Sequence, residues 1–129
     1  MKIRTLFVTA AIATATLTAP AFAWDWELLG TRDVRDAVDR DTIVVEGGRP
    51  FDRIRLCVYE RPVHFIDVDV HFANGGHQDI QVRARVQAGQ CTRAIDLEGD
   101  DRNIASVGMV YEANTRRRGV GATVRLYGE

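Results

Sequence analysis

Several residue types are scarce in this 129-residue sequence, and each scarcity excludes a class of protein. Serine occurs once, as Ser106 in a β-like run, and the sequence contains no Gly-x-Ser-x-Gly, no phosphate-binding loop and no His-Glu-x-x-His motif. Serine hydrolases, P-loop enzymes and zinc proteases of that type are therefore excluded. No segment after residue 23 approaches 18 apolar residues, so we expect no transmembrane segment there. We predict that the protein is not an enzyme and needs no cofactor.

Lysine is also nearly absent, and the one lysine belongs to a leader. Residues 1–23 combine a basic start (Lys2 and Arg4), an apolar stretch over residues 6–17 and a small-x-small cleavage site (Ala-Phe-Ala) at the end. This pattern is typical of a secretory signal peptide. An uncleaved membrane anchor is the alternative, but the apolar stretch is short and rich in alanine and threonine. We therefore predict a cleaved signal peptide, a single domain over residues 24–129, and a periplasmic or secreted location.

Neither sign of charge is in large excess. The chain has 17 basic and 18 acidic residues, and the leader holds two of the basic ones, which leaves a mature net charge of −3. A nucleic-acid binder or a polybasic membrane binder would carry a positive excess, so neither is expected. With 46% hydrophobic and 27% charged residues, the composition is that of an ordinary globular protein.

Only two cysteines are present, Cys57 and Cys91. A cysteine pair in an oxidising compartment favours a disulfide, and two separate thiols are the alternative. Alternation along the strand places Cys57 on the side opposite Leu56 and Val58, outside the main core, where a free thiol would be a liability. Neither cysteine lies in a C-x-x-C motif or beside a histidine, which argues against redox catalysis. We predict a Cys57–Cys91 disulfide.

Apolar side chains recur with a period of two along the chain, which indicates half-buried β-strands. The pattern is strong over residues 54–58, 66–72, 80–86 and 120–126 and weaker over 26–30, 42–46, 92–97 and 105–111. Because each strand has one apolar face, about eight of them require two sheets packed face to face. We predict an all-β fold, an antiparallel β-sandwich resembling a jelly roll, with a small closed β-barrel as the alternative.

One segment does not follow this pattern. Residues 31–41 place Val34, Ala37 and Val38 at helical spacing, but the segment is short, rich in aspartate and without a clear stop. We expect an irregular connection or a single helical turn.

The strands on either side of Asn74-Gly75-Gly76 can be given a register. Facing residues must share one side of the sheet, so we pair Val70 with Ile80 and expect a three-residue loop that ends in a left-handed Gly76. On the outer face this register gives two facing pairs, His71 with Asp79 and Asp67 with Arg83.

Charged residues gather on the outer face of this part of the sheet. We expect an acidic strand with Asp67, Asp69 and His71 between one basic strand with Arg53 and Arg55 and another with Arg83 and Arg85. Opposite charges on neighbouring strands attract, so the arrangement is first a salt ladder that fixes the register. It is alternatively a surface that binds a sugar or another charged ligand. A metal site from Asp69 and His71 with Asp79 or His77 is a weaker candidate, because the arginines oppose a cation.

Other polar segments are ordinary surface features first and candidate sites second. The run Arg116, Arg117 and Arg118 is typical of a solvated loop tip, and it is alternatively a contact for anionic lipid head groups or acidic glycans. Carboxylates around Gly99 match no calcium-loop signature. His64 is interpreted as an exposed turn histidine. Trp24 and Trp26 are interpreted as core or edge-covering residues, with a stacking platform for a sugar ring as the alternative.

Short motifs also recur in a familiar order, namely W-E-L-L-G at 26–30, D-R-D-T-I at 39–43, R-I-R-L at 53–56, F-A-N-G at 72–75 and I-D-L at 95–97. They resemble an uncharacterised family of small exported proteobacterial proteins, a domain of unknown function. The resemblance implies a signal peptide and a small β-rich domain, and it brings no catalytic residues. The two cysteines are not part of that pattern.

These observations favour a non-enzymatic, periplasmic or secreted binding or envelope-accessory domain. Its partner would be an envelope glycan, anionic lipid head groups or another envelope protein, and not a nucleic acid. The alternatives are a metal-binding protein or metal-dependent enzyme that uses Asp69 and His71, and a structural or stress-related exported protein without a ligand. The candidate ligand-binding residues are Arg53, Arg55, Asp67, Asp69, His71, Arg83, Arg85, Arg116, Arg117 and Arg118.

Overall fold

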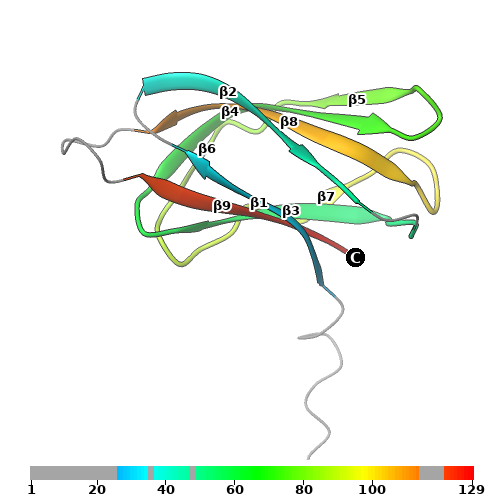
Figure 1. Ribbon diagram of the computed structural model, residues 1–129, viewed down its shortest axis with the longest axis horizontal. Coiled ribbons are helices and arrows are strands. Elements are labelled where there is room, and N and C mark those ends of the chain that lie inside the picture. The colour runs from blue at the N-terminus through cyan, green and yellow to red at the C-terminus, as the bar shows by residue number, and fades with distance from the viewer. Residues whose placement is uncertain (1–25, 35–36, 47–48, 114–120) are drawn as a thin grey trace, which may run out of the picture.

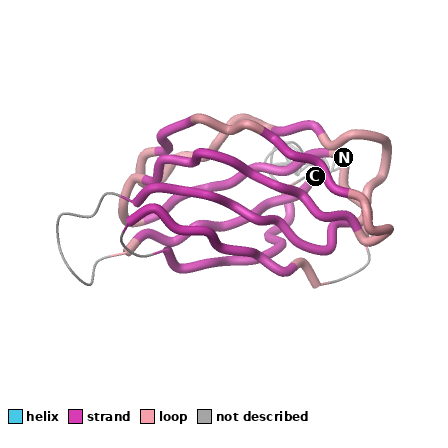
Figure 2. The backbone as a smooth tube through the Cα atoms, turned by 90° about the horizontal axis from the view of Figure 1, so that it is seen from above, coloured by secondary structure: helices cyan, strands magenta, loops and turns pink. Residues whose placement is uncertain are grey.

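The computed structural model describes residues 26–34, 37–46, 49–113 and 121–129. Its strands are β1 (Glu27–Val34), β2 (Ala37–Val44), β3 (Arg53–Tyr59), β4 (Val63–Phe72), β5 (His77–Ile80), β6 (Ala84–Val86), β7 (Ile95–Asp96), β8 (Ile104–Ala113) and β9 (Ala122–Gly128). Figure 2 shows strands running side by side along the long axis of the molecule, joined by loops at both ends. Within the described ranges no helix has the length and hydropathy needed to cross a membrane.

Two antiparallel sheets pack face to face, as Figure 1 shows. Sheet I has the order β1-β9-β3-β7, and sheet II has the order β2-β8-β4-β5, with β6 also paired to β4. The predicted β-sandwich is therefore confirmed, and the sheets do not close on each other. β3 and β4 follow each other in the sequence but lie on opposite sides of the core, because β3 belongs to sheet I and β4 to sheet II.

The period-two pattern places the core as predicted. Ile54, Leu56 and Val58 of β3 and Val124 and Leu126 of β9 have no exposed surface. Sheet II contributes Val63, Phe65, Val68, Val70, Val107, Met109 and Tyr111, all buried. Burial of alternate side chains from both sheets removes apolar surface from water, which is the main force that holds the sandwich together.

Two of the four strong strand predictions need correction in detail. In β4 a bulge interrupts the ladder with β8 between Phe65 and Asp67, so that Phe65 and Val68 both face the core and Ile66 is only half-buried. The strand predicted over 80–86 is interrupted after Ile80 and resumes as β6. This break lies opposite the bulge, where the pairing with β4 shifts by one residue.

The segment over residues 31–41 is mostly strand, so the predicted irregular connection or helical turn is wrong. It contains the end of β1 and the start of β2, which lie in different sheets. Arg32 of β1 forms an ion pair with Asp41 of β2 at 3.0 Å, and the Tyr111 hydroxyl donates to the same carboxylate at 2.6 Å. Burial and then the bond to Asp41 raise the pKa of Tyr111. These contacts join the two sheets along one edge.

The hairpin between β4 and β5 has the predicted loop length but another register. Val68, not Val70, faces Ile80, and the loop is Ala73-Asn74-Gly75. Gly75 is the left-handed residue with φ of 93°, not Gly76, whose N–H donates to the Asn74 side chain at 3.0 Å. Both registers keep the same side chains on the core side, so alternation alone does not distinguish them.

The predicted disulfide is confirmed. Cys57 of β3 is bonded to Cys91, 34 residues later in the sequence. The bond lies on the outer face of sheet I, away from the apolar core, and Cys57 is only 2% exposed. It fixes the segment before β7 to the edge of β3.

Candidate functional site

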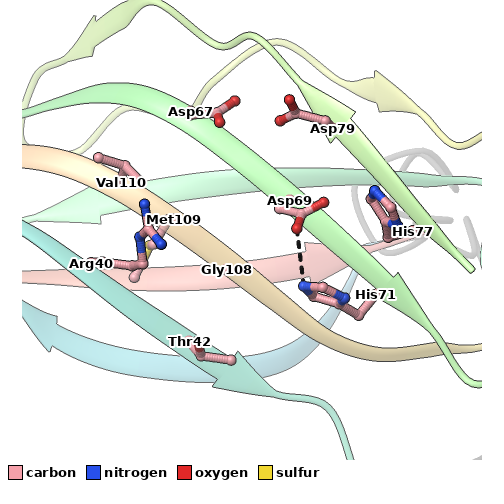
Figure 3. Close-up of a pocket in the computed structure, with 10 residues that line it drawn as sticks. All are labelled: Arg40, Thr42, Asp67, Asp69, His71, His77, Asp79, Gly108, Met109 and Val110. Carbon is pink, nitrogen blue, oxygen red and sulfur yellow. Dashed lines mark ion pairs between the residues drawn. The ribbon is translucent and has the colours of Figure 1, made fainter. Parts of the chain in front are cut away.

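The outer face of sheet II has a polar hollow of about 290 Å³, drawn in Figure 3. Four strands line it, and their pairing sets Thr42, Gly108, Asp69 and Asp79 in one row across the sheet. The full lining is Arg40 and Thr42 of β2, Gly108, Met109 and Val110 of β8, Asp67, Asp69 and His71 of β4, and His77 and Asp79 of β5. Since alternate residues share a face, the polar side chains of each strand point out of the sheet together.

Gly108 forms the floor of the hollow, and the fold does not require a glycine there. The ladders of β8 with β2 and with β4 run through Gly108 without a bulge. A Cβ at Gly108 would meet only the Asp69 carbonyl oxygen, at an ordinary 3.7 Å. By contrast, a Cβ at Gly30 would lie 2.4 Å from Ile43 and one at Gly128 would lie 2.7 Å from the Phe51 ring. A glycine inside a strand often marks a bulge, a sharp bend, or a place where a ligand or another backbone comes close, and no bulge is present at Gly108.

Acceptor groups dominate the β4 and β5 side of the hollow. Asp69 Oδ2 lies 3.0 Å from His71 Nε2, while its Oδ1 is buried and has no hydrogen-bond partner among the described residues. In Figure 3 Asp67 and Asp79 point toward each other. Burial, followed by a hydrogen bond to Asp79 and the charge of Asp79, raises the pKa of Asp67. Apart from the rings of His71 and His77, the side-chain donors of the lining are Arg40 and Thr42 on β2.

The Asp67–Asp79 contact makes a testable prediction about stability. The folded state holds the Asp67 proton more tightly than the unfolded chain, because the pKa of Asp67 is raised above its ordinary 3.8. The free energy of unfolding therefore falls as the pH rises through the range above 3.8. Asp67→Asn removes this penalty and is expected to stabilise the protein by up to about 1 kcal/mol at neutral pH, with no gain below about pH 3.

Urea unfolding of the Asp67→Asn variant and the wild type, measured across that pH range, checks this expectation. Asp100→Asn, which changes a carboxylate in an exposed turn, is the control and should shift neither stability nor its pH dependence. A loss of stability in Asp67→Asn at neutral pH would mean that the two carboxylates stabilise each other.

The structure does not assemble a metal centre from the candidates Asp69, His71 and Asp79. No three His, Cys, Asp or Glu side chains in the described ranges converge closely enough to hold a metal ion. Asp69 and His71 are already paired with each other, and the His77 ring lies 6.0 Å from the His71 ring. Ser106 faces His71 across the β4–β8 ladder, but no hydrogen bond joins their side chains in this structure.

The expected salt ladder does not form, because the candidate arginines lie elsewhere. Arg53 and Arg55 are on β3 and so belong to the outer face of sheet I. Arg83 lies in the break between β5 and β6 and does not face Asp67. His77, not Asp79, faces His71. Arg85 faces His64 at the other end of β4, beside Glu112. The run Arg116, Arg117 and Arg118 and Trp24 lie outside the described residues.

Five residues of the hollow were missed by the sequence analysis, namely Arg40 and Thr42 of β2 and Gly108, Met109 and Val110 of β8. Arg40 and Thr42 lie on a strand whose first half was interpreted as irregular, and Gly108 lies inside a strand that was only weakly predicted. The available signal was the glycine itself, since Gly108 interrupts an otherwise regular alternation between Val107 and Met109.

A protein-family model covers almost the whole chain. Residues 5–128 match the Domain of unknown function (DUF2541). The chain belongs to this family. The resemblance to an uncharacterised domain family is thus confirmed. No curated protein matches the DUF2541 chain significantly.

Among solved structures, AlgX from Pseudomonas aeruginosa is similar to the DUF2541 chain, with a TM-score of 0.51 and 15% sequence identity. The match covers 78% of this chain and 25% of the AlgX chain, so the DUF2541 chain spans about a quarter of the length of AlgX. At this identity the likeness concerns the fold alone.

Proposed function

We propose that this DUF2541 protein is a non-enzymatic binding domain outside the cytoplasm that binds a neutral glycan in the hollow on sheet II. The observation that carries the proposal is Gly108, which opens a polar hollow in the middle of a regular strand without any packing or backbone reason. A side chain there would increase strand propensity. Keeping a glycine at this position is consistent with a ligand that lies directly on β8.

The chemistry of the lining suits a polyhydroxylated ligand. Each sugar hydroxyl both donates and accepts hydrogen bonds, and adjacent hydroxyls donate well to one carboxylate. The Asp69 carboxylate, whose side chain is 37% exposed, supplies an acceptor whose Oδ1 has no partner among the described residues, and Arg40 and Thr42 supply donors across the glycine floor. A volume of about 290 Å³ accommodates a sugar unit.

Two further observations support the location. The Cys57–Cys91 disulfide is typical of proteins in oxidising compartments, and the leader over residues 1–23 has the pattern of a secretory signal. Asp67, Asp69 and Asp79 crowd one side of the hollow, where we assign them the role of hydrogen-bond acceptors for the ligand.

A glycan array probed with the full chain, expressed with its own leader and purified, tests the proposal, and calorimetry on the best neutral glycan follows. Asp69→Asn is expected to weaken that binding by about tenfold, since a charged acceptor is lost. Asp96→Asn, an exposed carboxylate on β7 of the other sheet, is the matched control and should bind like the wild type. Failure of every neutral glycan to bind, or wild-type affinity in Asp69→Asn, would overturn the proposal.

A further inference from the structure

The outer face of sheet I carries a second group of polar residues, in which arginines alternate with aromatic rings. The Arg55 guanidinium lies 4.4 Å from the centre of the Trp26 ring and 5.7 Å from that of Tyr127. The Arg125 guanidinium lies 4.7 Å from the centre of the Tyr59 ring. Stacking on aromatic rings holds a guanidinium in place while its N–H edge stays available. We call these five residues the arginine–aromatic face.

The two arginines of this face have no acidic partner in the part of the chain that the structure describes, whereas their neighbours do. Arg53 is paired with Glu129 at 2.8 Å, and Arg49 with Glu27 at 3.1 Å. Neither Arg55 nor Arg125 has a carboxylate within ion-pair distance in the described ranges. The Arg55 Nε is moreover buried without a hydrogen-bond partner among these residues.

The remaining acidic groups nearby are already engaged. Glu129 holds Arg53, and Asp33 accepts a hydrogen bond from the Thr123 hydroxyl at 3.2 Å. The pKa of Tyr127 is lowered, first by its hydrogen bond with Tyr59 and then by Arg125 and the charge of Arg55. The face therefore has a positive local potential although the whole chain carries a formal net charge of −1.

Pairing between β3 and β9 sets the distance between the two arginines. Arg55 faces Tyr127 and Cys57 faces Arg125, so Arg55 and Arg125 are diagonal neighbours on adjacent strands, with Cα atoms about 7–8 Å apart. The Cys57–Cys91 disulfide lies directly beside Arg125 on the same face and stiffens the sheet there. Two rigid anion receptors at a fixed short spacing fit a ligand whose negative charges repeat along a chain.

We propose that the arginine–aromatic face binds a carboxylated glycan, with the guanidiniums of Arg55 and Arg125 each receiving one sugar carboxylate. A guanidinium binds a carboxylate through two parallel N–H···O bonds, and stacking removes part of the entropy cost of holding it. The partly exposed rings of Trp26 and Tyr127 and the half-exposed side chain of Leu28, which faces Tyr127 on β1, offer apolar surface to the sugar rings. This site goes beyond the proposed function, because it lies on the opposite side of the sandwich and selects for charge.

Polygalacturonate is the probe, and its fully methyl-esterified form is the neutral control. The full chain is expected to bind polygalacturonate, more weakly as ionic strength rises, and to bind the ester at least about tenfold more weakly. Arg55→Gln and Arg125→Gln should each weaken binding by about tenfold. Arg53→Gln is the matched control, since its charge is already neutralised by Glu129, and it should bind within about twofold of the wild type.

Circular dichroism and thermal melts confirm that each variant folds, and Arg55→Lys keeps the charge if Arg55→Gln does not fold. Lysine cannot form the bidentate contact, so Arg55→Lys is still expected to bind more weakly than the wild type. Equal binding of polygalacturonate and its ester, wild-type affinity in Arg125→Gln, or binding to phosphatidylglycerol vesicles without binding to polygalacturonate would each overturn the inference.

Discussion

Replacement of both Cys57 and Cys91 with alanine is expected to lower the free energy of unfolding by about 4 kcal/mol. The disulfide closes a loop between residues 34 positions apart, and in the chain-entropy account a loop of this size restricts the unfolded chain by about that amount. Domains of this size have total stabilities of roughly 5–15 kcal/mol, so the loss is a large part of the whole. A melting temperature lower by about 15 °C should accompany it.

Urea unfolding with and without dithiothreitol separates the effect of the disulfide on stability from the effect of replacing the two side chains. Reduction should destabilise the wild type about as much as the double replacement does, and it should leave the double variant unchanged. Cys57 is buried, so alanine is preferred to serine there, because serine would bury a hydroxyl without a partner. A shift of the wild type by less than about 1 kcal/mol on reduction would contradict the prediction, and it would mean that the reduced chain keeps the two segments close together even when unfolded.

The backbone bonds around the disulfide explain what would remain. The Leu56 carbonyl accepts from Thr92 N–H at 2.7 Å, and the Val58 carbonyl accepts from Gly89 N–H at 2.7 Å. The Thr92 hydroxyl also accepts from Leu56 N–H at 3.0 Å. These hydrogen bonds keep the edge of β3 paired when the disulfide is reduced. We therefore expect a destabilised sandwich and not an unfolded chain at room temperature.

The fold could be predicted from the sequence because the residues that form the core follow a pattern within each strand. Side chains that alternate between core and water, as Ile54 and Leu56 do with Arg53 and Arg55, are recognisable within one strand. Two sheets then follow, because each strand has one apolar face to bury. The edge segment over residues 31–41 was not predicted as strand, because its exposed charged residues obscure the period-two pattern. Its partners β8 and β9 are also distant in the sequence.

The site was predicted less well, because it depends on which strands are neighbours. Asp67, Asp69 and His71 do share a face, as alternation requires. The strands predicted to flank them were wrong, since β3 belongs to the other sheet and alternation does not indicate which sheet a strand joins. The predicted hairpin register was wrong for a related reason: a shift of two residues keeps every core side chain on the same side of the sheet. The turn at Asn74-Gly75 sets the register of the hairpin.

Gly108→Val is expected to weaken neutral-glycan binding strongly and to stabilise the protein at the same time. The Cβ would sit 3.7 Å from the Asp69 carbonyl oxygen, so the backbone can accept a side chain there, and the two methyl groups of valine would fill the floor of the hollow. Valine has a much higher strand propensity than glycine, which should raise the free energy of unfolding by about 0.5–1 kcal/mol. Affinity for the neutral glycan should fall by about 30-fold or more, equivalent to about 2 kcal/mol.

The opposite signs of the two effects make this variant informative, because a loss of binding cannot then be ascribed to a damaged fold. Ser106→Val changes the same face of β8 two residues away, outside the hollow, and should leave binding within about twofold. Gly128→Val is the structural contrast: its Cβ would lie 2.7 Å from the Phe51 ring, so it should destabilise the sandwich. If Gly108→Val bound the glycan like the wild type, the ligand would not lie on β8; if it lost stability, the glycine would serve the fold and the main argument for the hollow would fail.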